Sequence, residues 1–321
     1  MSHATDKLPR EAVSAPDRAA SAPNPLTRLL RGEAALGYLF VAPAVLFLLV
    51  SAGYPLLLGI WYSLHDKVFG LPAEFVGLDN FIENLGDARF RRSVVTTVTY
   101  AAAAVVLKCV LGFAVALLLN REFPLRGVLR SLILLSWGLP EIAVVLGWSW
   151  LLDSQWGVIN YLLTSIGLIE SNIAWLSDPS LALATVVGVD VWRTFPFFAI
   201  TILAALQGID SQLYEATRLD GAGPVQQFRY ITLPHTLPVL SVVIVLATIW
   251  NLNDFTTIWF LTQGGPGGAT EIISIYTYQV AFAGLNDIGQ AASVSVMAMP
   301  LLAVLIGILV YTTKKREKVG G

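Results

Sequence analysis

The residues in this sequence that could do chemistry are polar side chains set within long apolar segments. Charge inside such a segment costs free energy, so these side chains are expected to face a partner or a water-filled cavity. Two tryptophans, Trp192 and Trp250, lie deep in the same segments. Indole faces stack on the apolar faces of sugars, while carboxylates and amides bind hydroxyl groups. The combination favours a translocation path for a polyhydroxylated solute, and its predicted lining is Glu141, Asp190, Trp192, Arg193, Trp250, Asn251, Asn253 and Asp254.

A second interpretation of the same residues is packing alone. Asp190 and Arg193 are three residues apart, so on a helix they share a face and can pair. Lys108 can extend its ammonium group to the membrane surface. The tryptophans near segment ends are typical of an interfacial belt. Pro140 and Pro196 would free backbone carbonyls, and they mark either bends beside the path or ordinary packing kinks.

Catalytic and metal-binding patterns are missing from the sequence. It contains no phosphate-binding loop of the Gly-x-x-x-x-Gly-Lys type and no His-Glu-x-x-His pair. The single cysteine excludes a disulfide within the chain, and the three histidines are far apart. We therefore expect no enzyme activity, no bound metal and no cofactor in this chain.

The composition is that of a membrane protein. Of 321 residues, 55% are hydrophobic and 13% are charged, whereas soluble domains carry roughly a quarter charged residues. Six apolar segments are each long enough to cross a hydrocarbon core of about 30 Å as a helix. The predicted fold is therefore an all-α membrane protein with six transmembrane helices, at 36–62, 93–119, 131–152, 182–206, 238–261 and 288–312. A β-barrel is excluded because these segments are continuously apolar rather than alternating.

The flanking regions complete the predicted domain organisation. Residues 1–34 are rich in Ala, Ser, Pro and charge and predict a disordered tail. Residues 35–313 form the six-helix domain, and 314–321 form a basic tail. With the N-terminus inside, fourteen Lys and Arg residues fall in cytoplasmic segments and four in outside segments. This asymmetry predicts that both termini are cytoplasmic.

The longest polar segment between apolar spans, residues 207–237, has a sequence that predicts ordered structure. Asp210 or Ser211 can cap a short helix over residues 212–220. Gly221 can end that helix in a left-handed turn, and Pro224 suits the first position of a second helix. The segment is therefore expected to be a rigid cytoplasmic projection, which we call the knob.

The amino-acid sequence of the knob resembles one family motif. Glu215-Ala216-Thr217, then Gly221, then Ile231-x-Leu233-Pro234, match the spacing of the Glu-Ala-Ala loop of ABC importer permeases, with Thr217 in place of the second alanine. The surrounding residues resemble the carbohydrate-uptake branch, represented by maltose and glycerol-3-phosphate permeases. Further similar stretches are Leu117–Arg121, Asp190–Arg193 with Pro196-Phe197, and Leu261–Pro266.

This resemblance implies a type I ABC importer permease in the inner membrane of a prokaryote. It implies a second homologous permease subunit, two ATPase subunits that bind the ATP and magnesium, and an extracytoplasmic solute-binding protein. It also implies that the knob is the coupling helix seated in an ATPase, with the contact residues Leu213, Tyr214, Glu215, Ala216, Thr217, Arg218, Asp220 and Gly221. No nucleic-acid partner is expected.

Alternatives remain within and outside this family. The solute could be glycerol phosphate or another polar molecule, although the three acidic residues in the spans favour a neutral sugar. A secondary transporter driven by an ion gradient would predict an internal repeat, and the sequence shows none.

Overall fold

The computed structural model describes residues 33–284 and 286–317. The tail predicted for residues 1–34 therefore lies outside the described residues except for its last two, and helix α2 begins at Glu33. The chain divides into two compact units, residues 1–57 and 58–321.

The first unit is a single apolar helical run. It contains α2 (Glu33–Leu48), the π-helical turn η1 (Leu49–Gly53) and the start of α3 (Tyr54–Ser63). The stretch Gly37–Ser63 is long and apolar enough to cross a membrane, and no residue of its most apolar 18-residue segment is buried against the rest of the protein. This confirms a helix at the first predicted span.

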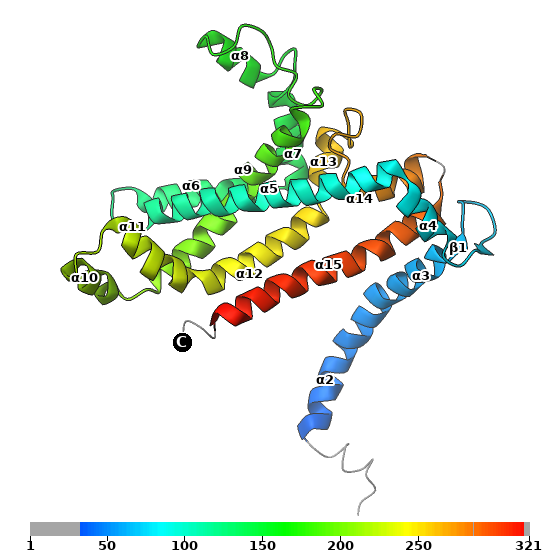
Figure 1. Ribbon diagram of the computed structural model, residues 1–321, viewed down its shortest axis with the longest axis horizontal. Helices are drawn as coiled ribbons and strands as arrows, with labels where there is room; N and C mark the ends of the chain where they lie inside the picture. Colours follow the sequence, from blue (N-terminus) through cyan, green and yellow to red (C-terminus); the bar gives the residue numbers. More distant parts are fainter. Residues whose placement is uncertain (1–32, 285, 318–321) are drawn as a thin grey trace, which may run out of the picture. The chain divides into compact units, whose positions relative to one another are not determined.

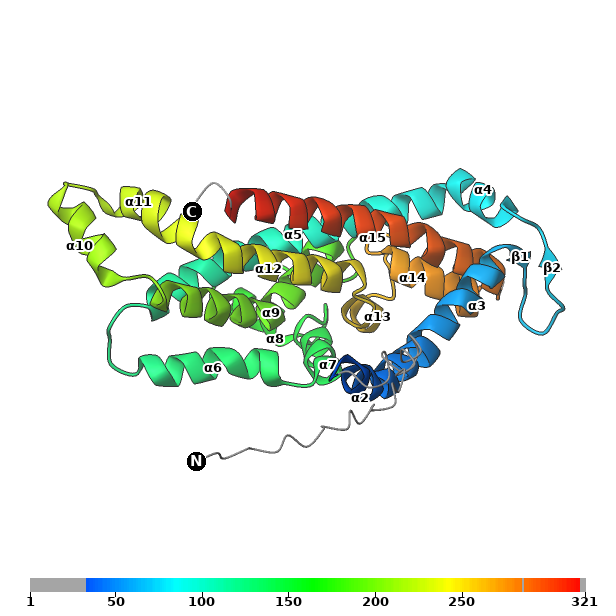
Figure 2. The ribbon, with the colours of Figure 1, turned by 90° about the horizontal axis from the view of Figure 1, so that it is seen from below.

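Three long helices form the centre of the second unit: α5 (Ala88–Leu119), α9 (Ala182–Gln207) and α12 (Leu233–Leu252). Each packs against the other two, and α15 (Ile288–Glu317) lies along α12 (Figures 1 and 2). Helices α5 and α9 approach closely at Gly112, where an added Cβ would lie 2.5 Å from the Cβ of Phe198. Gly112 therefore lets the two helix backbones come together.

The predicted third span is bent rather than straight. Helices α6 (Arg126–Gly138) and α7 (Glu141–Leu151) meet at an angle of 93° across Leu139 and Pro140. The proline lacks the N–H that would continue the helical hydrogen bonding. The bend predicted at Pro140 is confirmed, whereas Pro196 lies inside the unbroken helix α9.

The predicted fifth span, 238–261, was placed wrongly. A continuous helical run extends from Pro224 to Leu252 through α11 (Pro224–Gln227), η2 (Phe228–Thr232) and α12. Pro234 sits in the first turn of α12, where a missing N–H is tolerated. The helix then breaks at Asn253–Phe255 before α13 (Thr256–Leu261), so Asn253 and Asp254 lie between two helices and not within one.

Four described helices are long and apolar enough to cross a membrane, or five when α6 and α7 count as one bent span. The sixth predicted span is occupied by α15, a helix of 30 residues that is not among those counted.

Short elements connect the long helices. Strands β1 (His65–Asp66) and β2 (Glu74–Phe75) pair antiparallel, which corrects the purely helical prediction. The connecting helices are α4 (Asp79–Gly86), α8 (Val158–Ser165), α10 (Ser211–Leu219), α14 (Ile273–Tyr278) and the π-helical η3 (Gln279–Ala283). The buried side chain of Asn84 ties α4 to α15 through a 2.7 Å hydrogen bond to the Ser293 hydroxyl.

Because the α5–α9 crossing has no room for a methyl group, Gly112→Ala should destabilise the protein. We expect a loss of about 1–3 kcal/mol from overpacking, measured as a lower midpoint of thermal unfolding in detergent. Gly188→Ala in α9 is the matched control, because an added Cβ there meets nothing within 4 Å. The control should be neutral or slightly stabilising, as alanine favours helix by up to about 1 kcal/mol. Equal midpoints for the two variants would contradict the close crossing.

Candidate functional site

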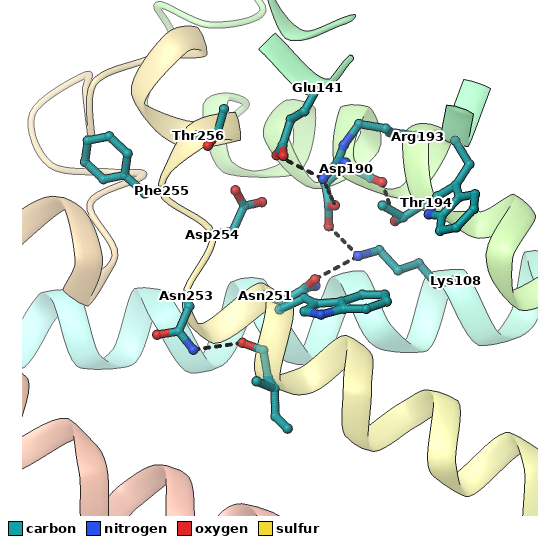
Figure 3. Close-up of a pocket in the computed structure, with 13 residues that line it drawn as sticks. Lys108, Glu141, Asp190, Arg193, Thr194, Asn251, Asn253, Asp254, Phe255 and Thr256 are labelled. Atoms are coloured by element: carbon teal, nitrogen blue, oxygen red, sulfur yellow. Dashed lines mark hydrogen bonds and ion pairs between the residues drawn. The ribbon is translucent and has the colours of Figure 1, made fainter. Parts of the chain in front are cut away.

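A cavity of about 470 Å³ lies where α5, α7, α9 and the end of α12 converge (Figure 3). It collects most of the residues predicted to line a path: Glu141, Asp190, Arg193, Trp250, Asn251, Asn253 and Asp254. These residues are spread over more than one hundred positions, from Glu141 to Asp254, and the helix packing brings them together. Lys108, Trp137, Thr194, Ile249, Phe255 and Thr256 complete the lining.

In the lining of the cavity a buried ion pair joins two of the three central helices, and a hydrogen bond joins the third. The Lys108 ammonium on α5 lies 2.7 Å from the Asp190 carboxylate on α9 and donates a 2.8 Å hydrogen bond to Asn251 Oδ1 on α12 (Figure 3). The two charged side chains are 2% and 1% exposed. The proposal that Lys108 extends to the membrane surface is therefore wrong. We call Lys108, Asp190 and Asn251 the clasp.

A second ion pair in the cavity lining is more exposed than the first. Arg193 Nη2 on α9 is 3.1 Å from Glu141 Oε1, and Glu141 is the first residue of α7 after the bend. Arg193 also lies 3.9 Å from Asp190, so the predicted pairing of these two residues is present but is the longer contact. Both side chains of the Arg193–Glu141 pair keep partial exposure to the cavity. A solute could therefore reach this pair without unfolding the bundle.

Asp254 is held at the break between α12 and α13. Its carboxylate accepts a 2.6 Å hydrogen bond from the Tyr100 hydroxyl and a 3.1 Å bond from the Thr257 N–H. Asn253 turns back to donate to the carbonyl of Ile249. The charged side chains of the lining are thus two cations and three carboxylates, so the cavity carries a formal charge of one negative unit.

Two hydrogen-bond donors in the cavity lining are unused. Asn251 Nδ2 and Arg193 Nε are buried and have no acceptor among the described residues. An unsatisfied buried donor costs about 1–3 kcal/mol. Both atoms could donate to the oxygen atoms of a ligand.

Aromatic side chains form one wall of the cavity. Trp137 and Trp250 both pack against Phe197, with ring centroids 5.6 Å and 5.5 Å from it, and each tryptophan is 45% exposed. Trp137 was not among the predicted lining residues, although its position just before the Pro140 bend is the signal that could have found it. Trp192 packs edge-on against Trp148 at 5.3 Å and does not line the cavity.

The knob is folded as the sequence predicts. The Asp210 side chain accepts a 2.9 Å hydrogen bond from the Gln212 N–H and caps α10. Gly221 follows with φ of +80°, and Pro224 opens α11. The Tyr214 hydroxyl lies 2.9 Å from the Thr232 hydroxyl, which fixes α10 against the run that leads into α12. No residue of α10 is buried, and only Tyr214 and Thr217 in this helix are partly buried.

Comparison with known proteins identifies the family. Residues 108–316 match the model of the binding-protein-dependent transport system inner membrane component. The chain belongs to this family. It is therefore an inner-membrane permease.

Related permeases cover nearly the whole chain. The trehalose/maltose transport system permease protein of Thermococcus litoralis is 38% identical over 280 residues, which is 87% of this chain and 94% of that protein. An inner membrane ABC transporter permease protein of Escherichia coli is 36% identical over 92% of this chain and 99% of its own. The sulfoquinovosyl glycerol transport system permease protein of Agrobacterium fabrum is 32% identical over 88% of this chain and 92% of its own.

A solved structure shares the fold. A chain of a bacterial ABC transporter involved in the import of the acidic polysaccharide alginate superimposes with a TM-score of 0.78 at 22% identity. The match covers 91% of the permease and 99% of the other chain. The predicted type I importer fold is thus confirmed at the level of the chain's architecture.

Removing only one charge of the Lys108–Asp190 pair should lower the stability of the protein far more than removing both charges. Lys108→Met leaves the Asp190 carboxylate buried with only the longer Arg193 contact, and we expect a loss of about 3–5 kcal/mol. The double variant Lys108→Met/Asp190→Asn removes both charges and should recover much of the stability. The free energy of unfolding of each purified variant in detergent measures both losses of stability. Additive losses in the double variant would contradict a mutually dependent pair.

Proposed function

We propose that this permease passes a neutral saccharide across the membrane through the cavity beside the clasp. The observation that carries the proposal is the pairing of an aromatic wall, Trp137 and Trp250, with unused buried donors on Asn251 and Arg193. Aromatic faces suit the C–H faces of a sugar ring, and the donors suit its hydroxyl oxygens. The names of the trehalose/maltose and sulfoquinovosyl glycerol relatives support a carbohydrate.

The charge of the cavity argues for a neutral rather than an acidic sugar. Three carboxylates and two cations line it, and each cation already has a carboxylate within 3.1 Å. An anionic group would have to displace Glu141 from Arg193 and would meet a net negative field. A glycerol phosphate or another anionic solute is the second candidate, and the unused Nε of Arg193 is the observation that favours it.

The proposed membrane arrangement has six spans, with α15 as the sixth and both termini in the cytoplasm. Positive charge supports it, because fourteen of the Lys and Arg residues fall on the cytoplasmic side in this arrangement and four on the other. The knob is then cytoplasmic. A second permease subunit would complete the path, and two ATPase subunits would bind ATP and magnesium, so this chain itself would carry no catalytic residue and no cofactor.

The knob is proposed to couple the ATPases to the cavity. The residues offered for contact are Leu213, Tyr214, Glu215, Ala216, Thr217, Arg218, Asp220 and Gly221. Their helix is capped at Asp210 and braced at Thr232, so a push on α10 moves a rigid body. The chain enters the knob from α9 and leaves it into α12, and these two helices carry Asp190 and Asn251 of the clasp. Motion of the knob would therefore reach the cavity through its own flanking helices.

Gly221→Val tests the coupling role. A β-branched residue resists the φ of +80° at this position, with strain of about 1–3 kcal/mol. The elbow should distort while the spans remain folded. In vesicles containing the assembled transporter, we expect the ratio of solute imported to ATP hydrolysed to fall.

Gly223→Val is the matched control for this variant. Gly223 has a φ of −74°, which any residue adopts, and an added Cβ there meets nothing within 4 Å. The control should keep the wild-type ratio. A normal ratio for Gly221→Val, with assembly intact, would contradict the coupling assignment of the knob.

Trp250→Ala tests the saccharide cavity. Loss of a stacking face worth about 0.5–1.5 kcal/mol should slow uptake roughly twofold to tenfold at saturating binding protein. Trp192→Ala is the control, because Trp192 is of similar exposure but lies outside the cavity. If Trp192→Ala impaired uptake and Trp250→Ala did not, the path would run along a different face of α9.

A further inference from the structure

A second cavity, of about 300 Å³, lies at the start of α5, away from the clasp. Its walls are Arg89 and Arg92 of α5, the glycine-rich loop 263–268 that follows α13, and Glu271. None of its lining residues is aromatic, in contrast to the first cavity with Trp137 and Trp250. The second cavity therefore lacks the stacking face that a sugar ring would use.

One of the two arginines is already neutralised. Arg89 Nε donates to both carboxylate oxygens of Glu271 at 3.0 Å, and its Nη2 donates to the Gln279 side chain. Glu271 is almost fully buried beneath this contact. The Arg89–Glu271 ion pair is therefore electrically neutral and forms one side of the cavity.

The other arginine is available to a partner. Arg92 is exposed, and it forms no ion pair with any described residue. It gives the cavity a net positive charge of one unit. The neighbouring Arg91, by contrast, points to the preceding turn and donates to the carbonyls of Leu85 and Gly86.

The glycine loop adds unused donors beside Arg92. Gly267 and Gly268 have φ of +58° and +81°, and their N–H groups donate to no acceptor in the described part of the chain. A Cβ placed on Gly268 would lie 3.8 Å from Arg92 Nη1 and 3.7 Å from Glu271 Oε2, so the backbone there lies against both the guanidinium group and the carboxylate of the Arg89–Glu271 pair. A guanidinium group next to free backbone N–H groups is suited to a carboxylate.

The position of this cavity links it to the solute cavity. Helix α13 is six residues long and joins Thr256 of the first cavity to the loop of the second. Helix α5 carries Arg92 near its start and Lys108 of the clasp further along. In Figure 1, the α4–α14 end of the second unit lies opposite α10, which is the extracytoplasmic end if the knob is cytoplasmic.

We infer that the cavity around Arg92 receives an acidic side chain of the solute-binding protein when that protein docks. The inference rests on the proposed function, since it assumes that α10 faces the cytoplasm. The docked carboxylate accepts hydrogen bonds from the Arg92 guanidinium and from the N–H groups of Gly267 and Gly268. Docking then touches the loop that leads through α13 to the solute cavity.

The test measures docking of the purified, solute-loaded binding protein to the assembled transporter in lipid nanodiscs, at low and high salt. Arg92→Gln should raise the dissociation constant roughly twofold to fivefold at low salt, as expected for an exposed ion pair. The salt dependence of the association rate should also weaken. Arg92→Lys keeps the charge and should retain most of the affinity.

Arg91→Gln is the matched control, one residue away with the same charge but outside the cavity. It should dock as the wild type does. Equal docking by the Arg92→Gln and wild-type transporters, or equal weakening by Arg91→Gln and Arg92→Gln, would overturn the inference. In either case uptake by the wild type would leave the proposed function standing.

A free acidic solute is the competing occupant of the cavity. An oligosaccharide of uronic acids, added without the binding protein, should bind the wild-type and Arg92→Gln transporters equally weakly. Binding that depends on Arg92, with docking of the binding protein unchanged, would make the cavity a solute subsite and overturn the inference. A wild-type transporter that neither docks the binding protein nor imports solute would overturn the proposed function as well.

Discussion

The ion pair between Lys108 and Asp190 is the contact on which the rest of the second unit depends. An ammonium and a carboxylate with almost no exposure would be very unfavourable in the interior of a membrane protein if either stood alone. Together with Asn251 they require α5, α9 and α12 to meet at one level. The cavity lies at this meeting point, and all three clasp residues line it. The sequence left two interpretations of these polar side chains open, packing and the lining of a path. In the structure the same side chains hold the helices together and also line the cavity between them.

The clasp also explains how a distant knob could act on the cavity. Helices α9 and α12 enter and leave the knob, and they contribute one clasp residue each. The close crossing at Gly112 keeps α5 against α9, so the three helices have little freedom to slide separately. Rigid packing of this kind transmits displacement because cores resist compression. At the other end, α13 and the start of α5 connect the cavity to the Arg92 pocket.

Local sequence signals predicted the local structure well. The cap at Asp210, the glycine elbow and the second helix at Pro224 all occur where the turn chemistry places them. The fourth span and the bend at Pro140 were also predicted, because apolar length and a missing N–H act within a few residues. The error in the fifth span also involves proline. The predicted span begins at Pro238, whereas α12 begins earlier and contains both Pro234 and Pro238.

Pairings between helices could not be read from the sequence. Lys108 and Asp190 are 82 positions apart, and nothing near either residue specifies the other. The same holds for Glu141 with Arg193 and for Tyr100 with Asp254. The spacing of polar residues along a helix indicates which of them are buried. Which buried residues contact each other depends on how the helices cross. For this reason Trp192 was grouped with the path residues although it packs outside the cavity.

Electron cryo-microscopy of the assembled transporter, stalled during import with its saccharide, tests the central claim most directly. We expect solute density in the cavity, stacked on Trp250 or Trp137 and within hydrogen-bond distance of Asn251, with α10 seated in an ATPase subunit. Solute density on a different face of the bundle, with the cavity filled only by water, would contradict the proposed path. A knob standing free of the ATPases would contradict the proposed coupling.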